Sequence, residues 1–292
     1  MVGRAVQFGR SQSHFLLSMR KTRLDQRLVQ LGLTPSREQA RRLIMAGEVL
    51  VEGQLVDRPA ANVADEAVIE LKARPRFASR GGEKLEAALA HFGVEVAGRV
   101  CADVGASTGG FTDCLLQRGA ARVYAIDVGH GVLDFRLRTD PRVVVMEDTN
   151  ARFVPQLAEP VSLITVDVSF ISLKLLLPVL KAWLPPLPLR DGGRGGEGLI
   201  CLIKPQFEAG RREVGKGGGV IRDPAVHRRV LAEVLRFAEA EGYTLRGLMR
   251  SPLLGPKGNA EFLAWLAGPA SAEAVELSAA IDALIPPLSD AT

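Results

Sequence analysis

The spacing of apolar positions predicts two short helices near the beginning of the chain. Apolar residues recur there every three or four positions, in one stripe of Leu24, Leu28 and Leu31 and a second of Ala40, Leu43 and Ile44. A stripe with this period buries one face of a helix. Gly32 and Gly47 follow the two stripes and are placed to end the helices, and Ser36 is placed to cap the second one.

Residues after the second helix have the composition and spacing typical of β-strands. Residues 49–56 read VLVEGQLV, two β-rich pieces around Glu52 and Gly53, which is typical of a hairpin. Residues 67–71 (AVIEL) predict another short strand. The sequence therefore predicts a small helix–helix–hairpin domain over residues 21–72.

From residue 83 onward, short apolar runs alternate with helical stretches. Seven runs are strand candidates, at residues 100–105, 122–128, 143–148, 163–170, 198–204, 243–251 and 259–266. This alternation predicts an α/β fold, a doubly wound parallel sheet with helices on both faces and an antiparallel edge near the C-terminus.

These patterns divide the chain into five segments. We expect a disordered leader over residues 1–20, in which Met19 could equally be the true start, the small domain over 21–72 and a basic linker over 73–82. The large α/β domain spans 83–268, and a C-terminal helix and tail span 269–292.

Charge is distributed unevenly between these segments. The formal net charge is +4, but residues 1–84 hold 15 Lys and Arg against 9 Asp and Glu, which leaves the rest of the chain slightly acidic. The positive field thus surrounds the small domain, where it would attract a polyanion. The basic side chains expected to contact RNA there are Arg23, Arg27, Arg37, Arg41 and Arg42. The alternative is an ordinary solvated basic face.

The sequence argues against a metal site and against a membrane span. Its three cysteines and four histidines show no metal-ligand spacing, and the cysteines are expected to be small core residues in a reducing compartment. The most apolar stretch, residues 161–189, is interrupted by Asp167, Lys174 and four prolines. We therefore expect a cytoplasmic protein without a catalytic metal or stable membrane association.

A glycine-rich turn after the first strand of the large domain indicates a nucleotide-type site. The turn spans residues 103–111 (DVGASTGGF), and its glycine spacing suits an adenosyl amino acid better than a pyrophosphate. Asp127 and Asp148 follow the next two strands, where they could hold ribose hydroxyls and an adenine edge. The expected cofactor-binding residues are Asp103, Gly105, Ala106, Ser107, Thr108, Gly109, Gly110, Phe111, Asp127, Asp148 and Asp167.

Four further residues could meet at the same edge of the sheet. Asp167 and Lys204 end the fourth and fifth strands, where parallel strands place their carboxyl ends together. Lys84 precedes the first strand and Glu261 lies near the last one, so both could reach the same rim.

The small domain resembles the ribosomal-protein-S4-like RNA-binding domain. Residues 23–63 contain that family's pattern of RLD, SR, LI and spaced glycines and valines, with Glu52 where Asn is usual before the hairpin glycine. The resemblance implies an RNA-binding role.

The large domain resembles the FtsJ-like 2′-O-methyltransferases in its Lys, Asp, Lys, Glu order. Together with the S4-like domain and the phrases SRGGEKL, DVSFISL, KPQFEAGR and VGKGGGVIRDP, it is similar to the TlyA (hemolysin A-like) family of rRNA methyltransferases over residues 21–268. The resemblance implies a Rossmann-like methyltransferase sheet that uses S-adenosyl-L-methionine. It also implies cytidine 2′-O-methylation of ribosomal RNA, free or in a ribosomal subunit, and favours the large-subunit RNA.

The implied reaction is an in-line attack of a ribose 2′-oxygen on a sulfonium methyl group. The oxygen loses its proton during the attack, and a lysine can accept that proton only in its neutral form, which burial and a nearby like charge favour. We expect Lys204 to be the base and Lys84 to favour its neutral form or position the ribose. Asp167 and Glu261 would orient the lysines and the hydroxyl.

One long glycine-rich loop is expected to contact RNA as well. Residues 208–223 (EAGRREVGKGGGVIRD) contain five glycines and four basic residues, and Arg211, Arg212 and Lys216 are the candidate phosphate contacts. The alternative is an exposed disordered loop.

Two other functions are alternatives for the whole chain. A membrane-active cytolysin would need an amphipathic or spanning element and a secretory signal, and the sequence shows neither. A non-catalytic RNA-binding assembly factor would not need the intact set of Lys84, Asp167, Lys204 and Glu261.

Overall fold

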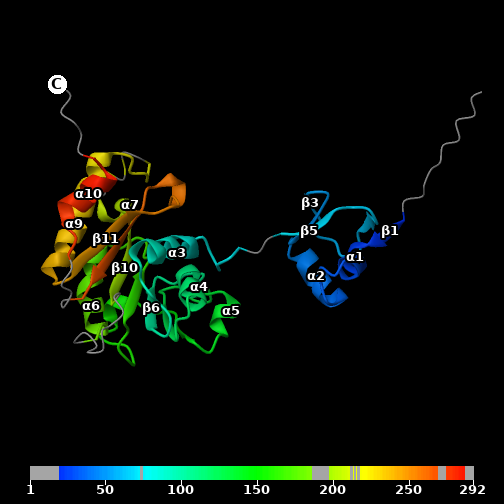
Figure 1. Cartoon of the computed structure of the whole chain (residues 1–292), viewed down its shortest axis with the longest axis horizontal. Coiled ribbons are helices and arrows are strands. Elements are labelled where there is room, and N and C mark those ends of the chain that lie inside the picture. The colour runs from blue at the N-terminus through cyan, green and yellow to red at the C-terminus, as the bar shows by residue number, and fades with distance from the viewer. Residues whose placement is uncertain are drawn as a thin grey trace, which may run out of the picture. The chain divides into compact units, whose positions relative to one another are not determined.

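The computed structural model describes residues 20–72, 75–185, 197–210, 213, 215, 218–268 and 274–286. The chain divides into two compact units, Met1–Arg74 and Pro75–Thr292 (Figure 1). The expected leader, apart from Arg20, lies outside the described residues, and so do Arg211, Arg212 and Lys216.

In the N-terminal unit, the described residues 20–72 form two helices and five short strands. The elements are β1 (Lys21–Arg23), α1 (Leu24–Gln30), α2 (Arg37–Met45), β2 (Val49–Val51), β3 (Gln54–Leu55), β4 (Asn62–Ala64) and β5 (Ile69–Leu71). Strand β2 pairs antiparallel with β3 and β5, and β1 pairs antiparallel with β4. The predicted hairpin is confirmed. Glu52 and Gly53 at its tip both have positive φ, 50° and 74°, as a tight two-residue turn requires.

The apolar stripes of α1 and α2 face each other across a small core. Leu24, Leu28, Ala40 and Ile44 are fully buried in it, as the helical spacing predicts. Leu31, which was expected in the stripe of α1, is instead the residue that follows this helix and is exposed. The predicted cap of α2 is confirmed, since the Ser36 side chain accepts a hydrogen bond from the backbone N–H of Gln39 at 3.3 Å.

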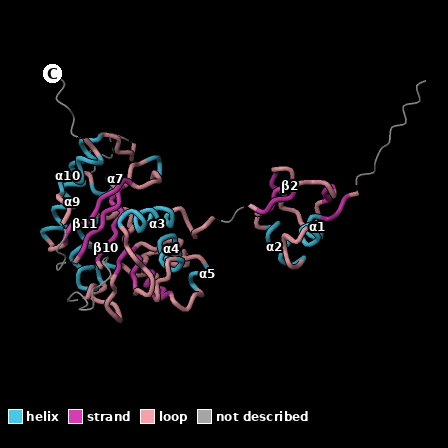
Figure 2. Tube along the Cα trace, in the orientation of Figure 1, coloured by secondary structure: helices cyan, strands magenta, loops and turns pink. Residues whose placement is uncertain are grey.

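The second unit is built on one seven-stranded sheet. Its strands lie in the order β11 (Thr244–Arg250), β12 (Phe262–Ala267), β10 (Gly198–Ile203), β9 (Leu163–Val166), β6 (Val100–Val104), β7 (Arg122–Ile126) and β8 (Val143–Met146). The five strands from β10 to β8 run parallel, whereas β12 is antiparallel to both β10 and β11. Figure 2 shows these strands in magenta among the cyan helices. The predicted doubly wound sheet with an antiparallel edge is confirmed.

Helices cover both faces of this sheet, because successive residues of a buried strand point to opposite faces. In β10, Ile200 and Leu202 join the core of one face, and Leu199, Cys201 and Ile203 join the core of the other. The first face is covered by α3 (Gly81–Phe92) and α4 (Gly110–Gln117). The second face is covered by η2 (Leu173–Leu175), α6 (Leu177–Leu180), η3 (Lys181–Trp183), α9 (Pro224–Ala240) and α10 (Leu277–Leu284).

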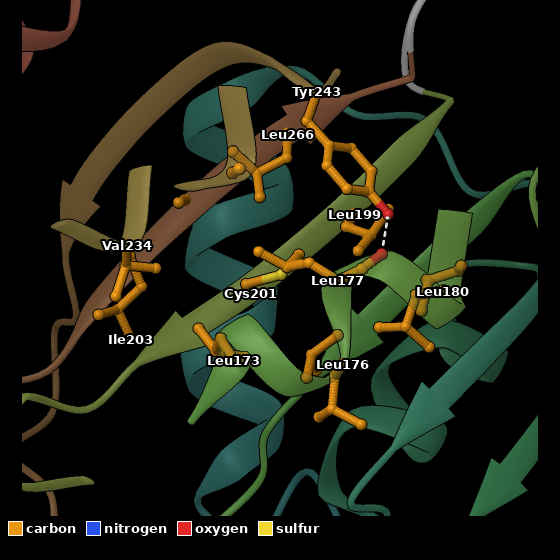
Figure 3. Packing of buried hydrophobic residues seen from close by; sticks show 14 of the residues in the cluster. Leu173, Leu176, Leu177, Leu180, Leu199, Cys201, Ile203, Val234, Tyr243 and Leu266 are labelled. Carbon is orange, nitrogen blue, oxygen red and sulfur yellow. Dashed lines mark hydrogen bonds between the residues drawn. The ribbon is translucent and has the colours of Figure 1, made fainter. Parts of the chain in front are cut away.

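The core of the second face is formed by buried apolar side chains. Figure 3 shows side chains of β10 meeting those of η2, α6 and α9, with the hydroxyl of Tyr243 donating a hydrogen bond to the carbonyl of Leu177 at 2.8 Å. Short elements complete the unit: α5 (Phe135–Arg138), η1 (Ala151–Phe153), α7 (Pro205–Glu208) and η4 (Pro256–Gly258).

The segment just before α3 is packed against the second unit. Phe77 is buried, and a Cβ on Gly82 would stand 2.2 Å from its ring. The backbone N–H of Ala78 donates to the Asp113 carboxylate of α4 at 2.8 Å. These contacts of residues 75–80 fix the first turn of α3, the helix that carries Lys84. The sequence predicted these residues to be part of a linker.

Candidate active site

The glycine-rich turn joins the end of β6 to α4. Gly105 has φ +84°, and a Cβ there would stand 2.5 Å from the backbone oxygen of Asp167. Only glycine therefore lets the turn lie against the end of β9. Ser107 also has positive φ, and its backbone N–H donates to the Asp127 carboxylate at 2.8 Å.

Asp127 connects this turn to the loop after β7. Besides the bond from Ser107, its carboxylate accepts one from the backbone N–H of Gly129 at 2.7 Å. The carboxylate also lines a pocket of about 410 Å³, together with Thr149, Asn150 and Phe170. This pocket lies at the carboxyl ends of the parallel strands, where open α/β sheets bind nucleotides.

A second pocket of about 420 Å³ adjoins the first. The two pockets share Gly105, Ser107, Asp167 and Ser169 as lining residues. Of the expected cofactor-binding residues, those that line one or both pockets are Gly105, Ala106, Ser107, Gly110, Phe111, Asp127 and Asp167.

Asp103 was predicted to bind the cofactor, but it does not line either pocket. It is fully buried, and its carboxylate accepts hydrogen bonds from the hydroxyls of Thr112 at 2.7 Å and Thr165 at 3.1 Å. It is an interior residue of β6, so its side chain points to the face that α4 covers. Asp103 therefore supports the turn from within. Burial raises the pKa of its carboxyl to about 7.

Three further expected cofactor residues also lie outside the pocket walls. Asp148 is exposed, with φ 51°, and its carboxylate lies 2.7 Å from Nδ1 of His130. A Cβ on Gly109 would clash with Leu137, so Gly109 serves the packing of α5 on the turn. The backbone oxygen of Thr108 accepts a hydrogen bond from Asp134.

The strand order brings the acidic and basic candidates together. Ile203 of β10 pairs with Phe262 of β12, so the next residues along, Lys204 and Glu261, follow at the same edge. Asp167 follows β9 on the other side of β10, and its Oδ1 lies 2.6 Å from Nζ of Lys204. Lys84, from α3, has its Nζ 2.6 Å from Oε2 of Glu261.

Both ion pairs are largely shielded from water. Glu261 is 1% exposed and Lys204 is 8% exposed, while the side chain of Lys84 is 11% exposed. The other oxygen of Glu261, Oε1, is buried without a hydrogen-bond partner among the described residues. A buried carboxylate oxygen of this kind can accept a hydrogen bond from a hydroxyl or N–H group of a ligand.

Gly255 makes room for the Glu261 carboxylate. A Cβ at Gly255 would stand 1.9 Å from Oε1 of Glu261, and Gly255 lines the pocket that contains Lys84, Asp167 and Lys204. Nothing in the neighbours of this glycine along the chain shows which side chain it faces, so its role was not predicted from the sequence.

Two other residues of the site were also missed. Ser169 accepts a hydrogen bond from Nζ of Lys204 at 3.0 Å. Phe170 lines the pocket of Asp127, is 91% exposed and has φ 64°, and its ring centroid lies 4.9 Å from that of Phe207. An exposed ring beside such a pocket offers a face on which a base can stack. The phrase DVSF contains both residues, but their conformation is invisible in the sequence.

The basic residues of the N-terminal unit differ in what they contact. Arg23 and Arg37 both bind the buried Asp25 carboxylate, at 3.1 and 3.0 Å, and Arg27 donates to the backbone oxygen of Asp65. Arg42 lies 3.7 Å from Glu38. Within the described part of the chain, the Arg41 side chain has no hydrogen bond or ion pair.

Comparison with protein families identifies the second unit. The model of the FtsJ-like methyltransferases matches residues 77–267, about two thirds of the chain. The chain belongs to the FtsJ-like methyltransferase family. The S4 domain model also matches this FtsJ-like protein, over residues 22–69. The predicted family resemblance is confirmed in both units.

Relatives of this FtsJ-like protein share both of its units. The 16S/23S rRNA (cytidine-2′-O)-methyltransferase TlyA of Mycobacterium tuberculosis is 45% identical over 251 residues, covering 85% of this chain and 90% of the relative. Hemolysin A of Brachyspira hyodysenteriae is 42% identical over 245 residues, covering 83% and 98%. A solved chain from Streptococcus thermophilus that carries the hemolysin name is 40% identical, covers 91% and 96%, and has a TM-score of 0.65.

The described residues contain neither a helix that could span a membrane nor a cluster of metal-ligating side chains. None of the helices they form combines the length and the apolar character needed to cross a membrane. They also contain no group of three or more His, Cys, Asp or Glu side chains that could hold a metal ion.

Proposed function

We propose that this protein transfers a methyl group from S-adenosylmethionine to the 2′-hydroxyl of a cytidine in ribosomal RNA. The observation that carries the proposal is the pair of shielded lysine–carboxylate contacts, Lys84–Glu261 and Lys204–Asp167, beside a glycine-rich turn. Basic and acidic groups placed in one pocket can take a proton from a hydroxyl and hold the alcohol in line for attack.

The two adjoining pockets fit an elongated cofactor of this kind. Asp127 and the neighbouring Thr149 and Asn150 would hold the adenosine, and the turn over residues 105–111 would hold the amino acid end. The shared residues Asp167 and Ser169 would then lie beside the reacting centre. When bound, S-adenosylmethionine supplies a methyl group activated by its positively charged sulfur.

Lys204 is the proposed general base. Its Nζ already contacts Asp167 and Ser169, which fix its position at the end of β10. In its neutral form, Nζ can take the proton that the 2′-hydroxyl loses as its oxygen attacks. Asp167 would then stabilise the lysine in the charged form that this step creates.

Glu261 and Lys84 are the proposed positioning pair for the ribose. The unpartnered Oε1 of Glu261 can accept a hydrogen bond from a ribose hydroxyl, while Oε2 stays bound to Nζ of Lys84. Such a bond would orient the sugar so that its 2′-oxygen faces the methyl group.

The RNA substrate is supported by the N-terminal unit and by the relatives. The S4 domain match covers the unit that carries Arg27 on α1 and Arg37, Arg41 and Arg42 on α2. The relative from M. tuberculosis is named for cytidine 2′-O-methylation of 16S and 23S rRNA. A protein that modifies ribosomal RNA would act in the cytoplasm.

Methyl transfer can be tested with tritiated S-adenosylmethionine and purified ribosomal RNA or ribosomal subunits. We expect label in the RNA, and mass spectrometry of its nucleosides should show 2′-O-methylcytidine. A liposome-leakage assay on the same preparation tests the activity implied by the hemolysin name of the Brachyspira relative. Leakage without methyl transfer would refute the proposal, and so would RNA binding without methyl transfer in the presence of the cofactor.

A further inference from the structure

Two cations in the wall of the candidate active site have no partner among the described residues. Arg80 and Lys257 line the same pocket as Lys84, Asp167 and Lys204. The charges of Lys84 and Lys204 are each met by a carboxylate oxygen at 2.6 Å. In the part of the chain that the structure describes, the side chains of Arg80 and Lys257 have neither a hydrogen bond nor an ion pair.

Both cations are attached to segments that position the proposed chemistry. Arg80 directly precedes α3, the helix of Lys84, and Lys257 lies in η4, between Gly255 and Glu261. Both residues are exposed. Lys257 has φ 58°, a backbone conformation that glycine adopts more easily, so this loop accepts a strained lysine at the pocket.

The charges in and beside this pocket do not balance. Four cations, Arg80, Lys84, Lys204 and Lys257, stand against the two carboxylates of Asp167 and Glu261. The proposed methyl donor brings a further positive charge on its sulfur. The site therefore attracts anionic groups, and its two unpaired cations are free to bind them.

We propose that Arg80 and Lys257 bind backbone phosphates of the RNA that flank the ribose to be methylated. The inference rests on the proposed function, since it concerns how the same pocket receives its substrate. Every internal ribose in RNA is bonded to a phosphate on each side, so a 2′-hydroxyl that reaches Lys204 brings both phosphates toward this pocket. A guanidinium binds phosphate with two parallel donors, and an ammonium binds it as a point charge.

The other anion that could meet these cations is the carboxylate of S-adenosylmethionine. That carboxylate is a single group, whereas each internal ribose of RNA brings two phosphates. Exposed positions such as those of Arg80 and Lys257 are better suited to a large ligand that arrives from solvent. Measuring cofactor binding and RNA binding separately distinguishes the two anions.

The test uses the full-length chain and single substitutions at each cation. Arg80→Ala and Lys257→Ala remove the charges, whereas Arg80→Lys and Lys257→Arg keep them. Arg236→Ala is the matched control, because Arg236 is exposed on α9, lines neither pocket and changes the net charge by the same amount. RNA binding is measured over a series of salt concentrations with S-adenosylhomocysteine present, and S-adenosylmethionine binding is measured by calorimetry without RNA.

We expect each alanine variant to weaken RNA binding several-fold and to lower the slope of log affinity against log salt by about 1. The KM for RNA should rise while the affinity for S-adenosylmethionine stays within about twofold of the wild-type value. Arg80→Lys and Lys257→Arg should largely restore binding, and Arg236→Ala should behave as wild type. Unchanged melting temperatures would show that the variants fold.

Two results would overturn the inference. If S-adenosylmethionine affinity falls while the salt slope for RNA is unchanged, the cations bind the cofactor carboxylate instead. If neither quantity changes, they bind neither ligand. A wild-type protein that transfers no methyl group to RNA would refute the proposed function, whereas the salt slopes of direct RNA binding would still test the phosphate contacts.

Discussion

Lys84 and Glu261 are 177 positions apart in the chain, yet Nζ of Lys84 lies 2.6 Å from Oε2 of Glu261. The contact depends on two local features. The packing of Phe77 and Ala78 fixes the start of α3, and the absence of a side chain at Gly255 leaves space for the Glu261 carboxylate. The contact between Lys84 and Glu261 therefore depends on the position of the start of α3 and on that of the backbone at Gly255.

This arrangement predicts that Gly255→Ala impairs methyl transfer. The backbone of Gly255, at φ −72° and ψ −175°, is open to any residue, so the substitution acts through the contact of its Cβ with Oε1 of Glu261. We expect displacement of the carboxylate and at least about a tenfold loss of kcat/KM, with S-adenosylmethionine affinity retained.

Gly268→Ala is the control for this substitution, because a Cβ at Gly268 would meet only Cδ1 of Leu184 at 3.6 Å among the described residues, an ordinary contact, and its φ is not positive. Gly268 lines neither pocket, so this variant should retain wild-type activity. If Gly255→Ala is as active as Gly268→Ala, the placement of Glu261 does not matter for turnover.

Lys204 can be tested as a base separately from its role as a cation. Lys204→Ala should lower kcat by about 100-fold or more, as expected for loss of a general base. Lys204→Arg keeps the positive charge and can still bind Asp167, but a guanidinium does not give up its proton in the working pH range. We therefore expect Lys204→Arg to be nearly as inactive as Lys204→Ala in single-turnover assays, while both bind S-adenosylmethionine.

Substantial turnover by Lys204→Arg would contradict the base assignment. It would show instead that Lys204 acts by its charge, for example by stabilising a 2′-oxygen that loses its proton elsewhere. Arg236→Ala serves again as a variant that removes one cation away from both pockets.

The sequence predicted the sheet well because its strands are buried on both faces. Continuous apolar runs such as residues 198–203 are hard to place in any other layer, and the glycine-rich turn marks where the first strand ends. The positions of Asp167 and Lys204 at the ends of two predicted parallel strands also indicated that these residues lie close together. These features are local, so they can be read from neighbouring positions.

Side-chain partners were less accessible to prediction. Which carboxylate pairs with which lysine depends on the order β9–β10–β12 and on the register of an antiparallel strand, both of which are long-range properties. Asp103 was expected in the cofactor site because it precedes Gly105. Its actual orientation follows from its place inside β6, opposite Thr112 of α4.

Asp103 predicts a specific dependence of stability on pH. Burial is the main cause that raises the pKa of its carboxyl to about 7, and the nearby charge of Asp167 adds to the effect. The folded protein thus holds this proton more tightly than the unfolded chain, in which an aspartate titrates near pH 4. The stability contributed by the protonated group is fully present below about pH 4 and is lost as pH rises toward 7.

Asp103→Asn cannot titrate, so it should lose less stability than the wild type between pH 5 and pH 8. The upper limit of the difference is about 3 kcal/mol, because only the two pH units between pH 5 and the pKa of about 7 contribute. Denaturant unfolding at the two pH values measures it. The raised pKa of the partly buried Glu208 acts in the same direction but is present in both proteins and cancels. If the free energy of unfolding falls equally in the two proteins, Asp103 is not protonated below neutral pH.

The arginines of the N-terminal unit can be separated into those that stabilise the fold and those free to bind RNA. Arg23 and Arg37 hold the pKa of the buried Asp25 carboxyl at about 2, so this pair of contacts stabilises the unit at neutral pH. Arg41 contacts no charged group among the described residues. Arg37→Ala should therefore lower the melting temperature of the unit. The loss in free energy of unfolding should be at most about 1 kcal/mol, because Arg37 is half exposed.

Arg41→Ala should leave the melting temperature unchanged and weaken binding to ribosomal RNA, with a salt slope reduced by about 1. Filter binding at several salt concentrations and thermal unfolding of the same preparations give both quantities. Arg236→Ala removes an equal charge from the other unit and should alter neither of them. If Arg41→Ala and Arg236→Ala have identical salt slopes, the free arginine of α2 is solvated surface, and RNA must be held by other residues.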